Sequence, residues 1–241
     1  MTETPPEPFA TVVIVAAGRG DRFGLPAKIL EPVGGRPVLE WSMIAAIEAR
    51  CVRDVIVVTG EQTAEAIANI IDATAWPKPV STVRGGVRRQ DSVAAGVDAI
   101  PADSEVVLIH DGARPLVEST LFENCANEAR MYGAAIAAVP VSDTLKHVTD
   151  RLIDGAVSRN GVWAAQTPQG FRLNVIRNAI ERCRTSDVEF TDEASMLETL
   201  GEPVHILQGA ATNLKITLRD DLEIVDSLLL RRIQRANETR Q

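Results

Sequence analysis

The chain has 241 residues, of which 45% are hydrophobic and 24% are charged, so it is long enough for one α/β domain with a sizeable core. Its net charge of −8 at pH 7 argues against non-specific binding to nucleic acid and to anionic membranes. A polyanionic ligand would therefore need a local cluster of arginine, lysine and backbone N–H groups.

The cysteines and the N-terminal residues predict a cytoplasmic protein. Cys51, Cys125 and Cys183 are odd in number and widely spaced, which favours reduced and mostly buried thiols over a disulfide framework or a zinc cluster. Residues 1–9 are acidic and rich in proline, unlike a secretory signal, and we expect them to form a disordered tail. No apolar run approaches the roughly 18 residues of a membrane-spanning helix.

Residues 10 to 139 alternate buried strands with helices. Short apolar runs rich in β-branched residues predict the strands, and apolar residues at helical spacing predict the helices. The predicted strands cover residues 10–17, 54–59, 80–84, 105–110 and 134–139, and the predicted helices cover residues 38–50, 62–71, 92–100 and 121–131. This order predicts a mostly parallel sheet with helices on both faces, in which ligands bind at the carboxyl ends of the strands.

The pattern changes after the fifth strand. The polar segments 144–148 and 152–158 predict an exposed β-hairpin, part of an arm that covers about residues 142–160. A hairpin that projects from a compact body cannot bury both of its faces alone. We therefore expect the arm to pack on another subunit, and a hairpin folded back on its own domain is the alternative.

Three more helices and one strand complete the predicted domain. Thr191 suits the N-cap of the second of these helices, and the two acids that follow it favour the helix dipole. We expect helices at residues 173–184, 191–200 and 220–233, a strand at 204–207, a domain that spans residues 10–234, and a frayed end at 235–241.

A glycine-rich loop follows the first predicted strand. Residues 15–24 read VAAGRGDRFG, and small residues at this place let backbone N–H groups approach an anion closely. Arg22 and Lys28 add two cations. The loop lacks the third glycine of a dinucleotide fingerprint, because residue 23 is Phe, and it lacks the GK[ST] ending of a P-loop. By itself it also fits a plain strand-to-helix turn with solvated charges.

The loop is the first of an ordered set of motifs. AAGxGxR with a following lysine, and GRPVLE downstream, resemble the signature of sugar-nucleotide and related nucleotidyltransferases. Further along lie GGVRRQDS (85–92), HDGARP (110–115), DTLK (143–146), RNGVW (159–163), QTPQ (166–169), TDEA (191–194) and NLKIT (213–217). Over about residues 11–225 their order resembles that of the 2-C-methyl-D-erythritol 4-phosphate cytidylyltransferase family, the CTP-dependent enzymes of the non-mevalonate isoprenoid pathway. The resemblance implies a Rossmann-like nucleotidyltransferase sheet with a projecting hairpin arm.

The resemblance implies that Arg22 and Lys28 contact the triphosphate of CTP and stabilise the transition state. Ala27 stands here where most relatives have proline, and the arginine-to-lysine spacing is one residue shorter, but a lysine stem is long enough to reach. The residues that the resemblance assigns to nucleotide binding are Ala16, Ala17, Gly18, Gly85, Gly86, Ser92 and Asp111. An ordinary turn is the alternative for the two glycines at 85 and 86.

The resemblance also implies a magnesium-dependent homodimer whose arms reach into neighbouring active sites. Mg²⁺ prefers oxygen ligands, and Asp111 is the candidate carboxylate. Thr212 stands where some relatives carry an acid, so no second carboxylate is expected there. The residues implied to position the methylerythritol phosphate are Arg114, Thr144, Arg159, Thr167 and Lys215. A local ion pair between Asp111 and Arg114, and a solvated Lys215, are the alternatives.

Other functions share part of this pattern. Transfer from CTP to ribitol 5-phosphate or a similar polyol phosphate is the nearest, because the two families share most of the motifs. Uridylyl and guanylyl transferases fit the hairpin and the RNGVW run less well. A nucleotide-binding protein without catalysis is disfavoured by the intact set of cations, and a dinucleotide oxidoreductase by the missing third glycine.

Overall fold

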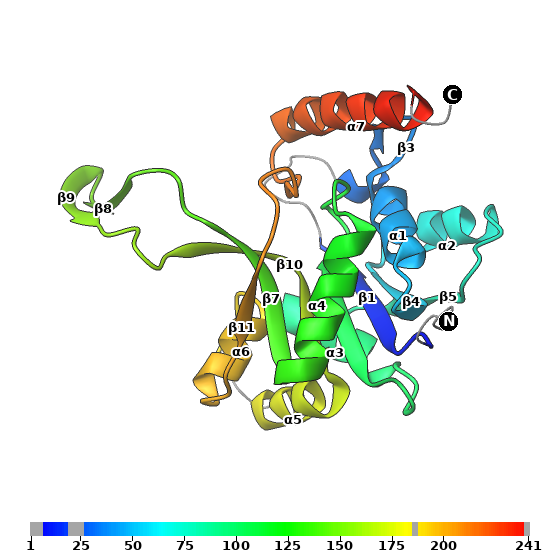
Figure 1. The fold of residues 1–241 in the computed structure, drawn as a ribbon, viewed down its shortest axis with the longest axis horizontal. Helices are drawn as coiled ribbons and strands as arrows, with labels where there is room; N and C mark the ends of the chain where they lie inside the picture. Colours follow the sequence, from blue (N-terminus) through cyan, green and yellow to red (C-terminus); the bar gives the residue numbers. More distant parts are fainter. Residues whose placement is uncertain (1–6, 19–26, 185–187, 239–241) are drawn as a thin grey trace, which may run out of the picture.

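The computed structural model describes residues 7–18, 27–184 and 188–238, and Figure 1 shows its fold. The strands are β1 (Ala10–Ala16), β2 (Pro32–Val33), β3 (Arg36–Pro37), β4 (Val52–Thr59), β5 (Val80–Arg84), β6 (Val106–Asp111), β7 (Ala134–Pro140), β8 (Leu145–Thr149), β9 (Leu152–Val157), β10 (Trp163–Arg172) and β11 (His205–Gln208). The helices are the short 3₁₀ helix η2 (Lys28–Leu30), α1 (Val38–Glu48), α2 (Ala64–Asp72), α3 (Arg89–Asp98), α4 (Ser119–Tyr132), α5 (Leu173–Cys183), α6 (Glu193–Thr199) and α7 (Asp220–Glu238). Within these residues no helix is long and apolar enough to cross a membrane.

Seven strands form the central sheet, in the order β11-β7-β10-β6-β1-β4-β5. β1 pairs in parallel with β4 and β6, β4 with β5, and β7 with β11. Only β10 among these seven strands runs antiparallel, to both β6 and β7. The predicted mostly parallel sheet is therefore confirmed.

Helices cover both faces of this sheet, as predicted (Figure 1). On one face, α1, α2 and α4 pack on a core that includes Ile14 of β1 and Phe122 of α4. On the other face, α3, α5 and α6 pack on a core that includes Val13 of β1 and Ile176 of α5. Successive residues of a strand point to opposite faces, so a continuous apolar run such as β1 serves both cores.

Strand β10 is absent from the prediction. Its sequence contains Pro168 and Gly170, two residues that normally argue against a strand inside a sheet. The register against β7 shifts between Ala165 and Gln169, and this irregularity accommodates the proline. The consequence for the site is direct, because β10 brings the QTPQ motif beside the end of β6.

The predicted arm is present. β8 and β9 form a separate two-stranded antiparallel sheet, and Figure 1 shows it projecting from the body of the molecule. Asp150 and Arg151 form the turn with positive φ angles of 48° and 70°. Apolar side chains on the arm are exposed, including Leu152 at 73% and Ile153 at 67%. The hairpin therefore does not fold back on its own domain.

Three predicted boundaries need correction. Phe9, expected in the tail, is buried and its backbone N–H donates to Cys51 O at 2.9 Å. Helix α7 continues to Glu238, into the segment expected to fray. Asp192 rather than Thr191 caps α6, because its carboxylate accepts the Ser195 N–H in a capping box. The three cysteines are buried free thiols, as predicted.

Candidate active site

The carboxyl ends of β1, β4, β5 and β6 bring the predicted nucleotide-binding residues to one edge of the sheet. Val15 at the end of β1 is in register with Asp111 at the end of β6. Beyond β5, the Gly85 N–H donates to Thr59 O of β4 at 2.9 Å. A Cβ on Gly85 would lie 2.7 Å from Ala17 Cβ, so the first loop and the second glycine-rich loop are in contact. Parallel strands place ligands at this edge.

Gly85 and Gly86 form more than an ordinary turn. The Gly86 N–H donates to Ser92 Oγ at 3.2 Å, and Ser92 is buried at the start of α3. This bond and the close approach to Ala17 fix the loop against both β1 and α3. Backbone groups on a loop fixed in this way can recognise the edge of a base with little loss of entropy.

Replacing Gly85 with alanine is expected to destabilise the fold. The added methyl would lie 2.7 Å from both Ala17 Cβ and Ser92 Oγ, so the loop must shift. Overpacking of this kind costs about 1–3 kcal/mol of unfolding free energy, measurable by urea denaturation. Gly18→Ala is the matched control, because a Cβ there meets nothing within 4 Å. Equal stability of both variants would contradict the expected crowding.

Asp111 is the centre of a cluster of cations. Its Oδ2 lies 2.8 Å from Lys215 Nζ and 3.4 Å from Arg114 Nε, and its Oδ1 lies 3.6 Å from Arg89 Nη2. Burial would raise the pKa of Asp111, but the charges of Lys215, Arg89 and Arg114 together lower it well below its usual value. The carboxylate is therefore ionised, and the cluster keeps a net positive charge that suits anionic ligands.

Both alternatives that the residues left open can be compared with this geometry. The local ion pair between Asp111 and Arg114 exists, but it is one part of the larger cluster. Lys215 is not a solvated surface lysine, because its ammonium group contacts Asp111 and its side chain is 37% exposed.

Thr167 of β10 holds Asp111 in place from the neighbouring strand. The Asp111 N–H donates to Thr167 Oγ1 at 3.0 Å, and the same hydroxyl lies 3.0 Å from His110 Nδ1. Burial lowers the pKa of His110 to about 3, so its ring is neutral. Asn213 Nδ2 donates to Thr167 O at 2.9 Å, and Arg114 Nη1 donates to Asn213 O at 2.8 Å. These bonds tie β6, β10 and the segment before α7 together around the carboxylate.

Lys28 reaches the same segment from the first loop. Its Nζ donates to Ile216 O at 2.7 Å, next to Lys215, and the Ile216 N–H donates to Ala113 O at 2.9 Å. The shortened loop therefore still brings Lys28 to the neighbourhood of Asp111. Arg22, the other cation predicted in this loop, lies outside the described residues.

Thr144 and Arg159 stand apart from this cluster. Both are exposed at the base of the arm, where Arg159 Nη1 donates to Ser142 O. Thr144 directly precedes β8 and Arg159 follows β9, at the two ends of the hairpin that projects from the body (Figure 1).

Arg89 and Glu193 belong to the site but were assigned no role from the sequence. Arg89 lies within the GGVRRQDS motif, and Glu193 lies within TDEA, where the sequence predicts only that both acids favour the helix dipole. Arg89 forms a two-pronged ion pair with Glu193, at 2.5 Å and 3.2 Å, and also approaches Asp111. Their positions inside two of the motifs were the only sequence signal for these residues. The pairing of Arg89 with Glu193 itself depends on the fold.

The chemistry of Asp111 fits a magnesium ion that also binds substrate phosphates. Mg²⁺ is commonly held by one or two carboxylates and by phosphate oxygens rather than by a cage of protein ligands. The described part of the chain contains no group of three or more His, Cys, Asp or Glu side chains that could hold a metal.

Comparisons with known proteins agree with this geometry. Residues 10–231 match the profile of the family described as IspD, 2-C-methyl-D-erythritol 4-phosphate cytidylyltransferase. The 2-C-methyl-D-erythritol 4-phosphate cytidylyltransferase of Microcystis aeruginosa is 41% identical over 224 residues, which cover 92% of this chain and 99% of that protein. The protein of the same name from Gloeobacter violaceus is 40% identical over 221 residues, which cover 90% of this chain and 95% of that protein.

Solved structures of the same kind share the fold. The cytidylyltransferase structure from Thermus thermophilus superimposes with a TM-score of 0.76 at 33% identity, covering 91% of this chain and 98% of that one. The 4-diphosphocytidyl-2C-methyl-D-erythritol synthase from Anaerococcus prevotii gives a TM-score of 0.81 at 30% identity, covering 92% and 98%. On the strength of the profile match and these relatives, this chain belongs to the 2-C-methyl-D-erythritol 4-phosphate cytidylyltransferase family of nucleotidyltransferases.

Proposed function

We propose that this chain transfers the cytidylyl group of CTP to 2-C-methyl-D-erythritol 4-phosphate, giving 4-diphosphocytidyl-2-C-methyl-D-erythritol and pyrophosphate. Membership of the family supports this reaction. The observation that carries it is the set of cations around Asp111, at the sheet edge that also carries the two glycine-rich loops. An acidic chain with a net charge of −8 can accept two phosphorylated ligands only at such a cluster.

The reaction needs alignment and charge stabilisation rather than a covalent intermediate. A phosphate oxygen of the acceptor attacks the α-phosphorus of CTP in line, and pyrophosphate leaves. Arg22 and Lys28 bind the triphosphate, and Lys28 stabilises the charge that develops on the α-phosphate. Arg114, Thr167 and Lys215 position the acceptor phosphate opposite the leaving group.

The remaining roles concern the nucleoside and the metal. Main-chain groups of Ala16, Ala17, Gly18, Gly85 and Gly86 line the nucleotide, and Ser92 fixes the second glycine loop. Asp111 orients the ribose or holds Mg²⁺. When bound, Mg²⁺ would neutralise part of the phosphate charge.

The active unit is a homodimer in which each arm completes the neighbouring site. Exposed apolar residues on β8 and β9, including Val148, Leu152 and Ile153, support this proposal, because a free arm would leave them in water. Arg159 and Thr144 then approach the acceptor from the partner. The cytoplasmic location stays a prediction, and the domain from residue 10 to 234 is proposed as one catalytic unit.

Mixing two inactive variants is expected to restore activity. Arg159→Ala removes the cation of the arm that is proposed to bind the acceptor, and Lys28→Ala removes a cation of the body, so a mixed dimer contains one intact site if the arm acts across subunits. Recovery of up to about one quarter of wild-type turnover is expected from random pairing, measured as pyrophosphate release after joint refolding. Mass spectrometry of intact dimers is the control. Confirmed mixed dimers without recovery would place Arg159 in the site of its own chain.

The choice of acceptor is tested by turnover. Pyrophosphate release is measured with CTP and Mg²⁺, and with either methylerythritol phosphate or ribitol 5-phosphate as acceptor. We expect methylerythritol phosphate to support turnover and ribitol 5-phosphate to support little. Turnover with ribitol 5-phosphate alone would favour the second candidate. Binding of CTP without turnover on either acceptor would indicate a nucleotide-binding protein.

A further inference from the structure

Arg89 links the candidate active site to a carboxylate on a different helix. It is the first residue of α3, directly after the Gly85–Gly86 loop. Its two terminal nitrogens bind both carboxylate oxygens of Glu193, the first residue of α6, at 2.5 Å and 3.2 Å. The second of these nitrogens also lies 3.6 Å from Asp111 Oδ1. The charges therefore alternate from Glu193 through Arg89 to Asp111.

The geometry of this pair limits how Arg89 can act on Asp111. A two-pronged contact fixes the plane of a guanidinium group as well as its position. Arg89 is held by Glu193 and stands 3.6 Å from Asp111 Oδ1, whereas Lys215 stands 2.8 Å from Oδ2. The contact of Oδ1 with Arg89 is therefore weaker than the contact of Oδ2 with Lys215. A carboxylate whose second oxygen is loosely held can still accept a hydroxyl group or a cation.

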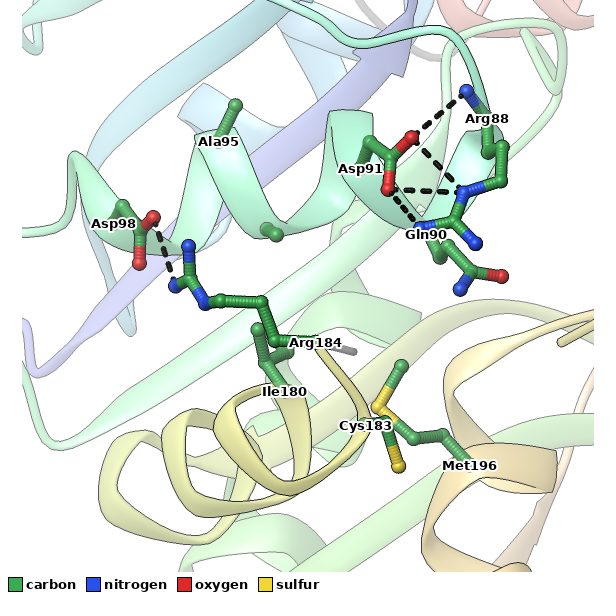
Figure 2. A pocket seen from close by; sticks show the side chains of 10 residues that line it. Arg88, Gln90, Asp91, Ala95, Asp98, Ile180, Cys183, Arg184 and Met196 are labelled. Atoms are coloured by element: carbon green, nitrogen blue, oxygen red, sulfur yellow. Dashed lines mark hydrogen bonds and ion pairs between the residues drawn. The ribbon is translucent and has the colours of Figure 1, made fainter. Parts of the chain in front are cut away.

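Polar contacts join the start of α3 to the start of α6, beside the apolar core that both helices share. A pocket of about 240 Å³ lies among α3, α5 and α6, and Ala95, Cys183 and Met196 are part of its lining (Figure 2). Beside the ion pair, Gln90 Oε1 accepts the Phe190 N–H at 3.0 Å, just before α6. The Arg89–Glu193 pair therefore joins the first residue of α3 directly to the first residue of α6.

From these contacts we propose that Glu193 acts through Arg89 as a positioning residue for Asp111. Glu193 holds the guanidinium so that it stabilises the Asp111 carboxylate without occupying its Oδ1 atom. Without Glu193, Arg89 no longer keeps its place beside Asp111, and the carboxylate loses one of the cations that orient it for the nucleotide. The inference rests on the proposed function in one respect, namely that Asp111 serves the CTP site.

The test separates positioning from simple stabilisation of the fold. Glu193→Gln removes the charge but keeps the shape, and it leaves Arg89 without its anchor. Its dissociation constant for CTP in the presence of Mg²⁺, measured by calorimetry, should rise about 10- to 100-fold, as is typical when a residue that orients a binding group is lost. The double variant Arg89→Gln with Glu193→Gln removes both charges together, so its melting temperature should return toward the wild-type value while the affinity for CTP stays low.

An ion pair at the other end of α3 provides the matched control. Asp98 and Arg184 join α3 to the residue after α5 at 3.3 Å, and both are half-exposed (Figure 2). Asp98→Asn should therefore change neither the melting temperature nor the affinity for CTP appreciably. The positioning role is overturned if Glu193→Gln binds CTP as the wild type does, or if the double variant regains affinity together with stability. A wild-type chain that binds no CTP at all would overturn the proposed function itself.

Discussion

Replacing Lys28 with alanine is expected to lower kcat about 100-fold or more, because an ammonium group that stabilises charge only in the transition state acts on kcat rather than on KM. The structure places Lys28 Nζ 2.7 Å from Ile216 O, on the segment that also carries Lys215. Loss of this hydrogen bond should cost about 1 kcal/mol of stability, too little to unfold the chain. Initial rates of pyrophosphate release at saturating CTP and acceptor measure the effect.

Lys78 provides the control for this prediction. Its Nζ also donates to a main-chain carbonyl, Ala49 O at 2.6 Å, but it lies in the loop before β5, away from the carboxyl ends of the strands. Lys78→Ala should therefore retain the wild-type kcat. A change confined to KM in Lys28→Ala would assign Lys28 to ground-state binding of the triphosphate instead.

The second large effect is expected for Asp111→Asn. The substitution removes the only anion that Lys215, Arg114 and the Nη2 atom of Arg89 share among the described residues. The three cations then repel each other and no longer hold one arrangement for the phosphates. We expect kcat/KM to fall about 100-fold and the Mg²⁺ concentration that gives half the maximal rate to rise.

Stability should respond as well, but less strongly. Breaking a fully buried ion pair costs about 3–5 kcal/mol, and partial exposure of Lys215 reduces the expected loss to about 2 kcal/mol. Asp103→Asn is the control, because Asp103 pairs with Arg53 at 2.8 Å on an exposed surface. Unchanged activity and metal dependence in Asp111→Asn would contradict the central place given to this carboxylate.

The central strands of the sheet could be predicted because their sequence pattern fits only one kind of structure. Strands β1, β4 and β6 each contain an apolar run of at least four residues, and a strand covered on both faces buries every residue of such a run. The arm could be predicted because its polar residues cannot belong to a core. Strand β10 could not, since its proline and glycine are tolerated only through the register shift against β7, which is a property of the assembled sheet.

Part of the candidate site could likewise be predicted from the sequence, and part of it could not. Asp111 and Gly85 follow predicted strands, so their position at the carboxyl edge follows from the topology. The pairing of Arg89 with Glu193 joins residues 104 positions apart, on two helices that only the complete fold brings together. No local sequence pattern distinguishes an acid that pairs with a distant arginine, as Glu193 does, from an acid that only favours a helix dipole. The N-cap of α6 was equally hard to predict, since Asp192 rather than Thr191 caps the helix.

A crystal structure of the chain with CTP and Mg²⁺ tests the central claim most directly. We expect the cytosine to lie against the Gly85–Gly86 loop and the triphosphate to lie within hydrogen-bonding distance of Lys28, with the ribose or the metal on Asp111. A nucleotide bound elsewhere on the molecule, with Lys28, Asp111 and Lys215 all remote from its phosphates, would contradict it.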